Sequence, residues 1–407
     1  MARKLRNNIE AAYIKSTKRN NKMAEKSVKN TNQRRHIKVE VERELWARAA
    51  GRCQFQGCNR VLYKSPITQE KVNISEKAHV HSFSKGGPRG RGPYEENNKG
   101  LDDIENLMLL CHDCHKTVDQ DEIKYSVPVL QQWKKEHESR IYTVTGIEAN
   151  LKSHVVFYCS NIGDHQSWFQ PEDAVIAMFP ERYPISENPI CLSMTWSNKD
   201  NTHSFWEQEV SNLEQEFERK IKPLINAKGA IMHFSLFPMA SIPLLIKLGT
   251  LFSDKIPVDT YQRFREPEGW CWQEFPEGFE FVIKPPEKKN CNPVLVISLS
   301  DTIKHERVKK IMGEEISIWE LTVPKKYIGN DNIRNKVQHS MMRTKIRDLM
   351  IRIKEMHGSV PLSIFPAMAN SCSVEMGRAR MPKADMPWVI YDQNNEKHGF
   401  IKTLTIN

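Results

Sequence analysis

Several common features are missing from this 407-residue sequence, and each absence excludes a class of protein. No apolar run approaches the roughly 20 residues that a membrane-spanning helix needs. The first 22 residues carry basic side chains but no apolar stretch, which argues against a secretory signal. We therefore expect a cytoplasmic protein with no membrane partner, whose nine cysteines do not serve as disulfides. Residues 154–407 contain no phosphate-binding glycine loop and no Gly-x-Ser-x-Gly sequence, so we expect no second catalytic set there.

Positive charge is concentrated at the N-terminus. Residues 1–38 contain twelve lysines and arginines and two glutamates, which accounts for the whole net charge of +10, because residues 39–407 carry 48 basic and 48 acidic side chains. The basic tail is either a solvated segment or an arm that contacts phosphates. The remainder of the chain is not a basic surface of the kind that coats nucleic acid.

The sequence pattern changes near residue 150. Residues 53–125 are rich in Gly, Asn, Cys and His, whereas from residue 154 on short apolar runs alternate with two long amphipathic helices, about 203–226 and 331–357. Such alternation is typical of an α/β sheet with both faces covered. The predicted organisation is a basic tail (1–38), a first domain (39–145), a linker (146–153) and a second domain (154–407).

An internal repeat divides the second domain. Ser-Leu-Phe-Pro at 235–238 and Ser-Ile-Phe-Pro at 363–366 each close a predicted strand that follows one of the long helices, and each is followed by a glycine at the same offset, Gly249 and Gly377. Duplication is the better interpretation, and it predicts two α/β halves, about 154–285 and 286–407. Both turns should lie at the carboxyl ends of strands, where α/β sheets bind ligands. The candidate ligand-binding residues are those of the turns and nearby positions: Ser235, Phe237, Pro238, Trp270, Trp272, Ser363, Phe365, Pro366 and Arg378.

Four of the nine cysteines form two closely spaced pairs, Cys53-x4-Cys58 and Cys111-x2-Cys114. Two such pairs can close a tetrahedral zinc site that joins segments with little core of their own. We therefore predict a structural Zn²⁺ site. The other five cysteines lack this pairing and are expected to be small buried apolar residues.

The residues around the second cysteine pair follow a specific order. The order is His79-Val80, then Gly86-Gly87, then Asn106-Leu107, then Leu110-Cys111-His-Asp-Cys114-His115. In these positions residues 39–145 resemble the HNH (ββα-metal) endonuclease family in its zinc-bearing form. The resemblance implies that His79 is the general base, that Asn106 orients the loop carrying it, and that His115 binds a catalytic divalent ion, Mg²⁺ or similar. Hydrolysis of a phosphodiester requires such a base and such a cation.

One position departs from the family pattern. Where many members place an acidic metal ligand directly before the base, this chain has Ala78. The missing ligand is a water, or His81, which alternation along a strand would put on the same face as His79, or Glu76, which alternation puts on the opposite face. We favour His81 over Glu76.

The order of domains carries a second resemblance. An HNH domain followed by a duplicated α/β unit resembles the HNH–SAVED effector nucleases of bacterial cyclic-oligonucleotide anti-phage signalling (CBASS), in which SAVED is a fused pair of CARF-like Rossmannoid halves. The resemblance implies that a cyclic di- or trinucleotide binds SAVED, that protomers assemble into a dimer or tetramer, and that the HNH sites then degrade double-stranded DNA.

Two other functions remain open from the sequence. One is a restriction-type HNH endonuclease whose C-terminal domain reads DNA sequence or modified bases, although residues 154–407 lack a basic run. The other is a non-catalytic, zinc-stabilised DNA-binding or ligand-sensing regulator, for which Ala78 is the best argument.

Overall fold

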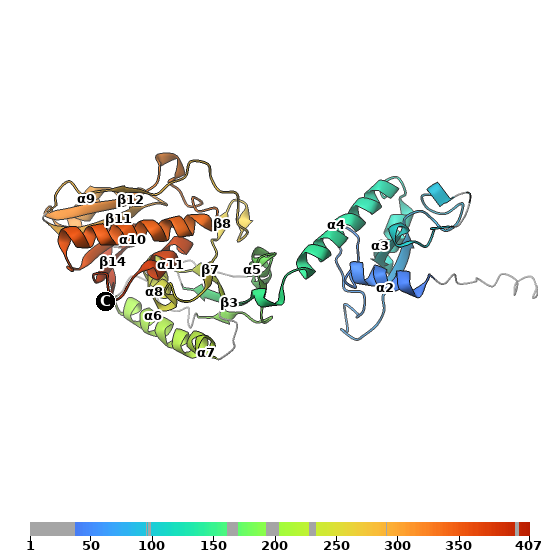
Figure 1. Cartoon of the computed structure of the whole chain (residues 1–407), viewed down its shortest axis with the longest axis horizontal. Coiled ribbons are helices and arrows are strands. Elements are labelled where there is room, and N and C mark those ends of the chain that lie inside the picture. Colours follow the sequence, from blue (N-terminus) through green and yellow to red (C-terminus); the bar gives the residue numbers. More distant parts are fainter. Residues whose placement is uncertain are drawn as a thin grey trace, which may run out of the picture. The chain divides into compact units, whose positions relative to one another are not determined.

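The computed structural model describes residues 37–94, 96, 99–160, 170–192, 203–227, 233–289, 291–394 and 399–407. The chain forms two compact units, residues 1–145 and 146–407, which we call unit 1 and unit 2 (Figure 1). Residues 1–36 of the basic tail lie outside the described residues, so both interpretations of the tail stay predictions. Among the described helices, none combines the length and apolar character required to cross a bilayer.

Unit 1 is built on a two-stranded antiparallel sheet and the helix that follows it. Its helices, turns and strands are α2 (Val39–Arg48), β1 (Ser75–His79), η1 (Gly92–Tyr94), η2 (Ile104–Asn106), β2 (Leu107–Cys111), α3 (His112–Gln120) and α4 (Val127–Thr145). In the register of β1 and β2, His79 lies opposite Leu107 and Ser75 lies opposite Cys111. The sequence β1, β2, α3 is the expected ββα arrangement, with the base candidate at the end of β1 and the second cysteine pair at the start of α3.

The core of unit 1 is small. All five residues of β2 are buried, and they pack with side chains of α2 and α4 such as Leu45 and Leu130. α2 itself has Glu40 and Glu42 in its first turn and Arg48 in its last, which matches the helix dipole. Residues 49–74 contain no helix and no extended strand, so this segment depends on other contacts for its shape.

Unit 2 contains two mainly parallel sheets. The helices and turns are η3 (Ala149–Leu151), α5 (Pro171–Met178), α6 (His203–Glu216), η4 (Phe217–Ile221), α7 (Lys222–Asn226), α8 (Ile242–Phe252), α9 (His305–Met312), η5 (Lys325–Tyr327), α10 (Val337–His357) and α11 (Asn370–Ala379). The strands of the first sheet are β3 (Lys152–Cys159), β4 (Tyr183–Pro184), β5 (Ile190–Cys191), β6 (Phe234–Met239) and β7 (Val258–Thr260). Those of the second are β10 (Val282–Lys284), β11 (Asn292–Ser298), β12 (Ile316–Thr322), β13 (Leu362–Ala367), β14 (Trp388–Asn394) and β15 (Gly399–Ile406), and β8 (Phe264–Arg265) and β9 (Glu268–Gly269) form a separate hairpin.

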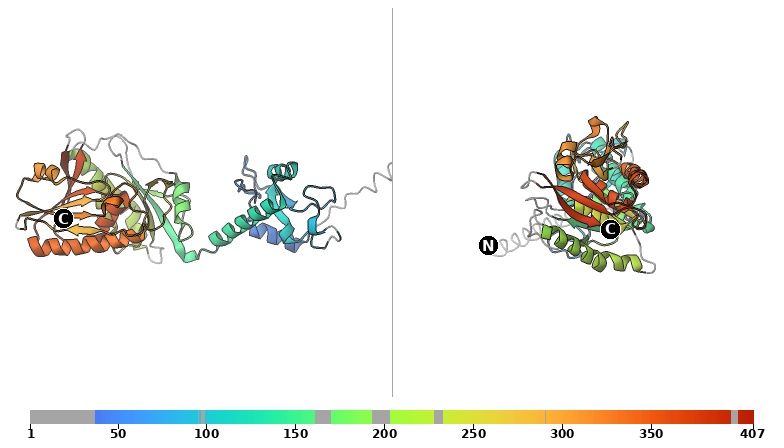
Figure 2. Two further views of the ribbon diagram at one scale, coloured as in Figure 1. Left: turned by 90° about the horizontal axis from the view of Figure 1, so that it is seen from above. Right: turned by 90° about the vertical axis from the view of Figure 1, so that its left-hand side faces the viewer.

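The sheet order shows why the strands read as continuous apolar runs. The first sheet has the order β4-β3-β6-β7 with β5 also paired to β3, all parallel, and the second has the order β10-β12-β11-β13-β14-β15, with antiparallel pairs at its two edges. Helices cover both faces of the second sheet (Figure 2). On β11, Leu295 packs in one cluster with Ile346 of α10, whereas Val294 packs in another with Val308 of α9. Strands buried on both faces need apolar residues at every position.

The internal repeat corresponds to two equivalent substructures. β6 is followed by α8 and β13 by α11, and these two helices cross at the repeat glycines. A Cβ at Gly377 would lie 2.9 Å from Cα of Gly249 and would overlap the carbonyl oxygen of Ile246. The aromatic residues of the repeated segments also match, because the ring of Phe237 stacks on Tyr261 with centroids 4.4 Å apart and that of Phe365 stacks on Tyr391 at the same distance. The repeat is therefore a repeat of structure.

Three details differ from the sequence expectation. The helix predicted over 331–357 begins at Val337, because the Gln338 side chain accepts hydrogen bonds from the backbone N–H groups of Arg334 and Asn335 and starts the helix there. The helix predicted over 203–226 contains a π-helical turn at 217–221. The second sheet begins before residue 286, since β10 pairs with β12. One of the short apolar runs expected to form strands, residues 190–196, is described only to residue 192.

Candidate functional site

The four paired cysteines come together in unit 1. Among the described residues, they form the single group of three or more potential ligands, and their Sγ atoms all lie within 4.8 Å of one another. Cys53 and Cys58 come from the loop after α2, Cys111 ends β2 and Cys114 lies in the first turn of α3. The cluster therefore ties an irregular loop to the ββα arrangement.

The loop of the first cysteine pair is docked onto β2 by backbone hydrogen bonds. The N–H of Gln54 donates to the carbonyl oxygen of Leu109 at 2.9 Å, and the N–H of Leu109 donates to Oε1 of Gln54 at 2.8 Å. The N–H of Cys111 donates to Sγ of Cys53 at 3.3 Å. These contacts fix the thiols before any ion binds.

The donor set fits Zn²⁺. Tetrahedral zinc with Zn–S bonds of about 2.3 Å places the sulfur atoms about 3.8 Å apart, which the observed cluster accommodates with a small contraction. Burial raises the pKa of Cys53 to about 12 and also raises the pKa of Cys114. These two thiols need a cation to ionise, and a coordinating Zn²⁺ deprotonates its thiols.

His79 is the last residue of β1 and its side chain is 21% exposed. Its Nε2 lies 2.9 Å from Oδ1 of Asp102, which belongs to the loop before η2. Sequence reasoning missed Asp102, because no regular spacing links it to His79. The position of His79 at a strand end, partly open to solvent and held by a carboxylate, suits a general base.

Asn106 is buried and acts on the backbone that follows His79. Its Oδ1 accepts from the N–H of His81 at 2.8 Å, and its Nδ2 donates to the carbonyl oxygens of Leu101 at 2.9 Å and of His81 at 3.2 Å. Its own carbonyl oxygen accepts from the N–H of Val80 at 2.9 Å. The side chain thus holds the segment directly after the base candidate, which is the geometry expected of a loop-orienting residue.

His115 lies in the first turns of α3 with its side chain 30% exposed. Its Nε2 is 3.3 Å from Oδ2 of Asp119, one helical turn later, and Asp119 also accepts from Nη2 of Arg89 at 2.7 Å. Asp119 was missed as well, although a spacing of four residues on a predicted helix could have indicated it. Arg89 carries no such signal.

His81 and Glu76 do not occupy the positions suggested for a missing metal ligand. β1 ends at His79, so strand alternation does not extend to His81, whose ring lies 5.9 Å from that of Tyr94. Its Nδ1 is buried and has no hydrogen-bond partner among the described residues. Glu76 Oε1 instead faces His112, at 3.4 Å from Nδ1.

Among the described residues, no second group of potential ligands lies close enough together to form a preformed cation site. In the described part of the chain, His79, His81 and His115 do not belong to any group of three ligand atoms within 4.8 Å. This suits Mg²⁺, which usually keeps several waters and binds through one or two protein ligands together with substrate phosphates.

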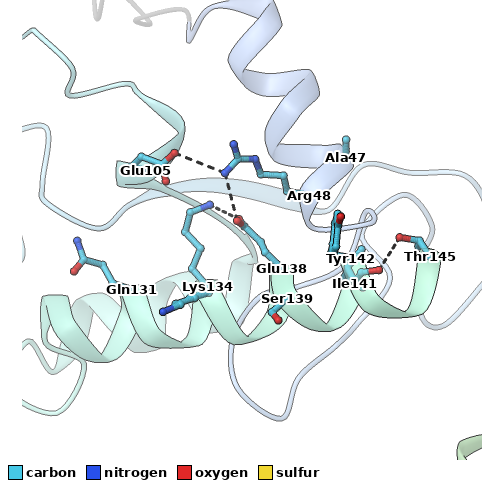
Figure 3. A pocket seen from close by; sticks show the side chains of 11 residues that line it. Ala47, Arg48, Glu105, Gln131, Lys134, Glu138, Ser139, Ile141, Tyr142 and Thr145 are labelled. Carbon is cyan, nitrogen blue, oxygen red and sulfur yellow. Dashed lines mark hydrogen bonds and ion pairs between the residues drawn. The ribbon is translucent and has the colours of Figure 1, made fainter. Parts of the chain in front are cut away.

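A groove of about 730 Å³ lies between α2 and α4 in unit 1 (Figure 3), and none of the candidate site residues predicted from the sequence lines it. Arg48 bridges Glu138 of α4 at 3.6 Å and Glu105 of η2 at 3.7 Å, and Lys134 also pairs with Glu138. Because Glu105 precedes Asn106, these ion pairs support the turn that carries Asn106.

Eight of the nine candidate ligand residues of unit 2 are packed in the interior. The buried residues are Ser235, Phe237, Pro238, Trp270, Ser363, Phe365, Pro366 and Arg378. The two Ser-x-Phe-Pro segments are not turns, as the sequence had suggested, but parts of the strands β6 and β13. Their side chains pack in the core, and the ring of Phe237 lies 5.2 Å from that of Trp270. Arg378 donates to three backbone carbonyl oxygens and to Glu375. A ligand at the surface would not reach these side chains, and the pattern of apolar residues in the two segments reflects the repeated core.

Trp272 is the candidate that lines a pocket. This pocket, of about 250 Å³, lies where the two halves of unit 2 meet. We call it the half-junction pocket, and its lining residues are Glu181, Val258, Asp259, Thr260, Tyr261, Trp272, Lys336, Val337, His339, Ser340, Arg343 and Glu375. Most of its residues come from β7 and the residues directly after it, the start of α10 and the middle of α11.

A buried polar network forms the floor of the half-junction pocket. The carboxylate of Glu375 accepts from Oγ1 of Thr260 at 2.6 Å and from Nη1 of Arg378 at 2.9 Å, and it pairs with Arg343. Burial alone would raise the pKa of Glu375, but the cations of Arg378 and Arg343 outweigh it and lower the pKa to about 2. Burial lowers the pKa of His339 to about 4. A charged carboxylate of α11 and a neutral imidazole of α10 thus line the same pocket.

Two family models match the chain, and both agree with the order of the two units. Residues 53–123 match the model of the HNH endonuclease, and residues 213–406 match that of SAVED, the SMODS-associated and fused to various effectors sensor domain. The expected fold class is confirmed as a ββα unit with a four-cysteine cluster followed by a sensor unit of parallel α/β sheets. No curated protein matches the chain at a significant level.

Several solved structures are similar to the chain at low identity. The Acinetobacter baumannii Cap4 SAVED/CARF-domain containing receptor with the cyclic trinucleotide 2'3'3'-cAAA is 11% identical with a TM-score of 0.40, and the match covers 68% of this chain and 54% of that one. The same receptor with the cyclic trinucleotide 3'3'3'-cAAA is 12% identical with a TM-score of 0.40, and the match covers 76% of this chain and 69% of that one. The Moraxella osloensis Cap4 SAVED/CARF-domain containing receptor is 13% identical with a TM-score of 0.34, and the match covers 76% of this chain and 68% of that one. The chain spans about half the length of the first of these relatives.

Proposed function

From a chain that combines an HNH endonuclease domain with a SAVED sensor domain, we propose a metal-dependent endonuclease that a cyclic oligonucleotide activates and that degrades double-stranded DNA in anti-phage defence by abortive infection. The observation that carries the nuclease half is the arrangement at the end of β1. There His79 is paired with a carboxylate and followed by a segment that Asn106 holds in place. The carrying observation for the sensor half is the domain match itself.

The residues of unit 1 divide the work of phosphodiester hydrolysis. His79 takes the proton of the attacking water, and its contact with Asp102 favours the tautomer with the proton on Nε2, which leaves Nδ1 as the acceptor. His115 is the proposed protein ligand of the catalytic cation. A divalent ion bound there would stabilise the negative charge that develops on the leaving oxygen. The Zn²⁺ held by the four cysteines is structural, because all four protein ligand positions of a tetrahedron are filled.

The half-junction pocket is the proposed point of contact with the activator. Pockets for drug-sized ligands measure about 300–1,000 Å³, so a pocket of about 250 Å³ admits a single base of a cyclic di- or trinucleotide. Trp272 offers an aromatic face for stacking. The pocket lining holds three carboxylates against the cations of Lys336 and Arg343, so it is suited to the base more than to the phosphates. The phosphates and the remaining bases lie outside it and are free to engage a second protomer of a dimer or tetramer.

The test is a plasmid-cleavage assay with Mg²⁺ and a panel of cyclic di- and trinucleotides. We expect negligible cleavage without a nucleotide and strong cleavage with one member of the panel. The His79→Ala protein should bind the nucleotide and retain zinc but lose activity by about 10²-fold or more, as expected when a general base is removed. His112→Ala is the matched control, because this exposed histidine lies between two cysteines and contacts Glu76. Trp272→Ala should raise the nucleotide concentration needed for half-activation and leave maximal cleavage unchanged.

Each alternative has its own outcome in this assay. Strong cleavage without any nucleotide would contradict gating, and defined cut sites under that condition would identify a restriction-type enzyme. Binding of DNA without cleavage in Mg²⁺, Mn²⁺ and Ni²⁺ would identify a non-catalytic regulator.

A further inference from the structure

A buried arginine in the loop between β1 and β2 has no role in the chemistry described above. The side chain of Arg89 is 4% exposed, and each end of its guanidinium is engaged. Nε donates to the carbonyl oxygen of Val80 at 2.8 Å, and Nη1 donates to that of Val118 at 2.7 Å. Nη2 donates to Oδ1 of Asp119 at 2.7 Å and, more weakly, to the carbonyl oxygen of His79 at 3.4 Å. Arg89 therefore contacts both β1 and α3.

These contacts connect the two histidines of the proposed nuclease site. His79 ends β1 and Val80 follows it, and Asp119 lies on α3 with its second oxygen 3.3 Å from Nε2 of His115. A continuous path of hydrogen bonds and ion pairs thus runs from the main chain of His79 through the guanidinium of Arg89 and the carboxylate of Asp119 to His115. β1 and α3 are separate elements, so their separation depends on such cross-links.

The backbone of Arg89 adopts a strained conformation. Its φ is +61°, in the left-handed region that non-glycine residues rarely adopt. Its N–H donates to Oε2 of Glu122 at 2.8 Å, which fixes that conformation. Strained backbone persists when the surrounding contacts over-determine it, and it is concentrated at functional sites. A lysine could not replace the side chain, because its single ammonium does not present the planar fork that meets three acceptors in different directions.

We propose that Arg89 is a positioning residue of the nuclease site, which sets the distance and orientation of His79 relative to His115. The inference rests on the proposed function of unit 1, because those two histidines are assigned there as base and cation ligand. Arg89 itself touches neither the water nor the scissile phosphate. It acts through the main chain of His79 and through Asp119.

The experiment compares Arg89→Ala and Arg89→Lys with wild type in the nucleotide-activated plasmid assay. We expect kcat to fall by about 10²-fold with KM for DNA nearly unchanged, which is the size of effect that a displacement of about 1 Å produces at a catalytic group. Zinc content should stay close to wild type, and unit 1 should keep its unfolding transition at a lower temperature, because the removed guanidinium leaves buried acceptors without a donor. Guanidinium ions, at concentrations too low to unfold the protein, should restore part of the activity of Arg89→Ala and none of the activity of His79→Ala. Arg140→Ala is the matched control, since that arginine of unit 1 contacts Asn59 and His137 instead.

A second measurement does not depend on cleavage. In ¹⁵N-histidine spectra of the full chain, the ring signals of His79 and His115 should both shift in Arg89→Ala. Those of His137, whose ring contacts the carbonyl oxygen of Ala49, should not. If wild type cuts no DNA under any condition, the proposed function fails while these spectra still test the link through Arg89.

Two outcomes would overturn the assignment. One is wild-type kcat in Arg89→Ala when wild type is active, together with unchanged ring signals of both histidines. The other is loss of zinc and of the unfolding transition of unit 1 in both Arg89 variants, which would make Arg89 a residue of the fold and not of the site.

Discussion

The two units differ in what holds their polar groups in place. In unit 1 a small core is supplemented by four thiols and by hydrogen bonds from buried polar side chains such as Gln54, Arg89 and Asn106 to the backbone of loops. In unit 2 a continuous hydrophobic core runs through both halves, and polar groups such as Glu375 and His339 are enclosed by it. In unit 1, therefore, polar contacts and thiols hold the segments around partly exposed histidines. In unit 2, hydrophobic packing holds the two halves together.

The largest expected effect comes from removing zinc. A chelator, or the substitution Cys114→Ser, should abolish the unfolding transition of unit 1, because structural zinc contributes about 10 kcal/mol or more to small metal-dependent folds. Unit 2 has a large core and, among its described residues, no cluster of metal ligands, so its transition should stay where it is. Calorimetry of the full chain, with zinc content measured in parallel, separates the two transitions.

Cys271→Ser is the control for this substitution, because Cys271 is an exposed cysteine of unit 2. It should change neither transition. The prediction that the unpaired cysteines are buried is therefore wrong for Cys271, and also for the exposed Cys191, whereas Cys159 and Cys372 are buried. If unit 1 keeps its transition after zinc is gone, the hydrogen bonds of Gln54, Arg89 and Asn106 suffice for the fold, and the contrast between the units would be smaller than described.

The features that the sequence predicted, and those that it missed, also differ between the two units. In unit 1 the short spacings within the two cysteine pairs predicted the four-cysteine cluster, because a local motif fixes local geometry. The resemblance to HNH endonucleases pointed to Asn106, whose side chain is hydrogen-bonded to the segment after His79. Asp102 and Arg89 escaped prediction, since they reach the site from loops whose conformation no spacing determines. Asp119 could have been found, because it lies one helical turn after His115.

In unit 2 the sequence predicted the strands but not the pocket. Continuous apolar runs indicated most of the strands, and the repeat indicated two halves, yet the repeated Ser-x-Phe-Pro segments were interpreted as ligand contacts and are interior. The helices that follow those segments, α8 and α11, were not predicted. They carry Gly249 and Gly377, and a fixed offset in sequence does not reveal that two glycines meet in space. The half-junction pocket draws on separate segments between Glu181 and Glu375, so it appears only in the folded unit.

The second largest predicted effect is a loss of stability of unit 2 when the crossing of α8 and α11 is disturbed. In Gly377→Ala the new methyl group would meet the backbone of Ile246 and Gly249, neither of which can rotate away as a side chain could. We expect unit 2 to lose about 3 kcal/mol of unfolding free energy or slightly more, at the upper end of the cost of overpacking. The sign is informative, because an alanine in place of a glycine in a helix otherwise gains about 1 kcal/mol.

Chemical denaturation with a probe in each unit measures this effect. Gly329→Ala is the control, since a methyl group there meets nothing within 4 Å. A stabilised Gly377→Ala protein would show that the helices separate without loss and that packing at the crossing does not join the two halves.

The smallest predicted effect is the loss of stability of unit 2 at acidic pH. His339 is buried, contacts Oγ of Ser371 at 2.9 Å through Nε2, and has a pKa of about 4 because burial disfavours its charged form. In the unfolded chain its pKa returns to about 6.5, so between pH 6.5 and 4 the unfolded state binds more protons than the folded state. Stability of unit 2 should therefore decrease as the pH falls from 7 to 5, by about 1–2 kcal/mol for this residue. Glu375, with a pKa of about 2, stays ionised over this range and does not contribute to the change.

In His339→Gln the unfolding free energy of unit 2 should depend less steeply on pH than in wild type, while that of unit 1 follows the wild-type curve. Equal slopes in the two proteins would mean that the imidazole is already accessible to protons in the folded state. The half-junction pocket would then be a solvated surface, and the contrast between a cross-linked unit 1 and an enclosed polar network in unit 2 would not hold.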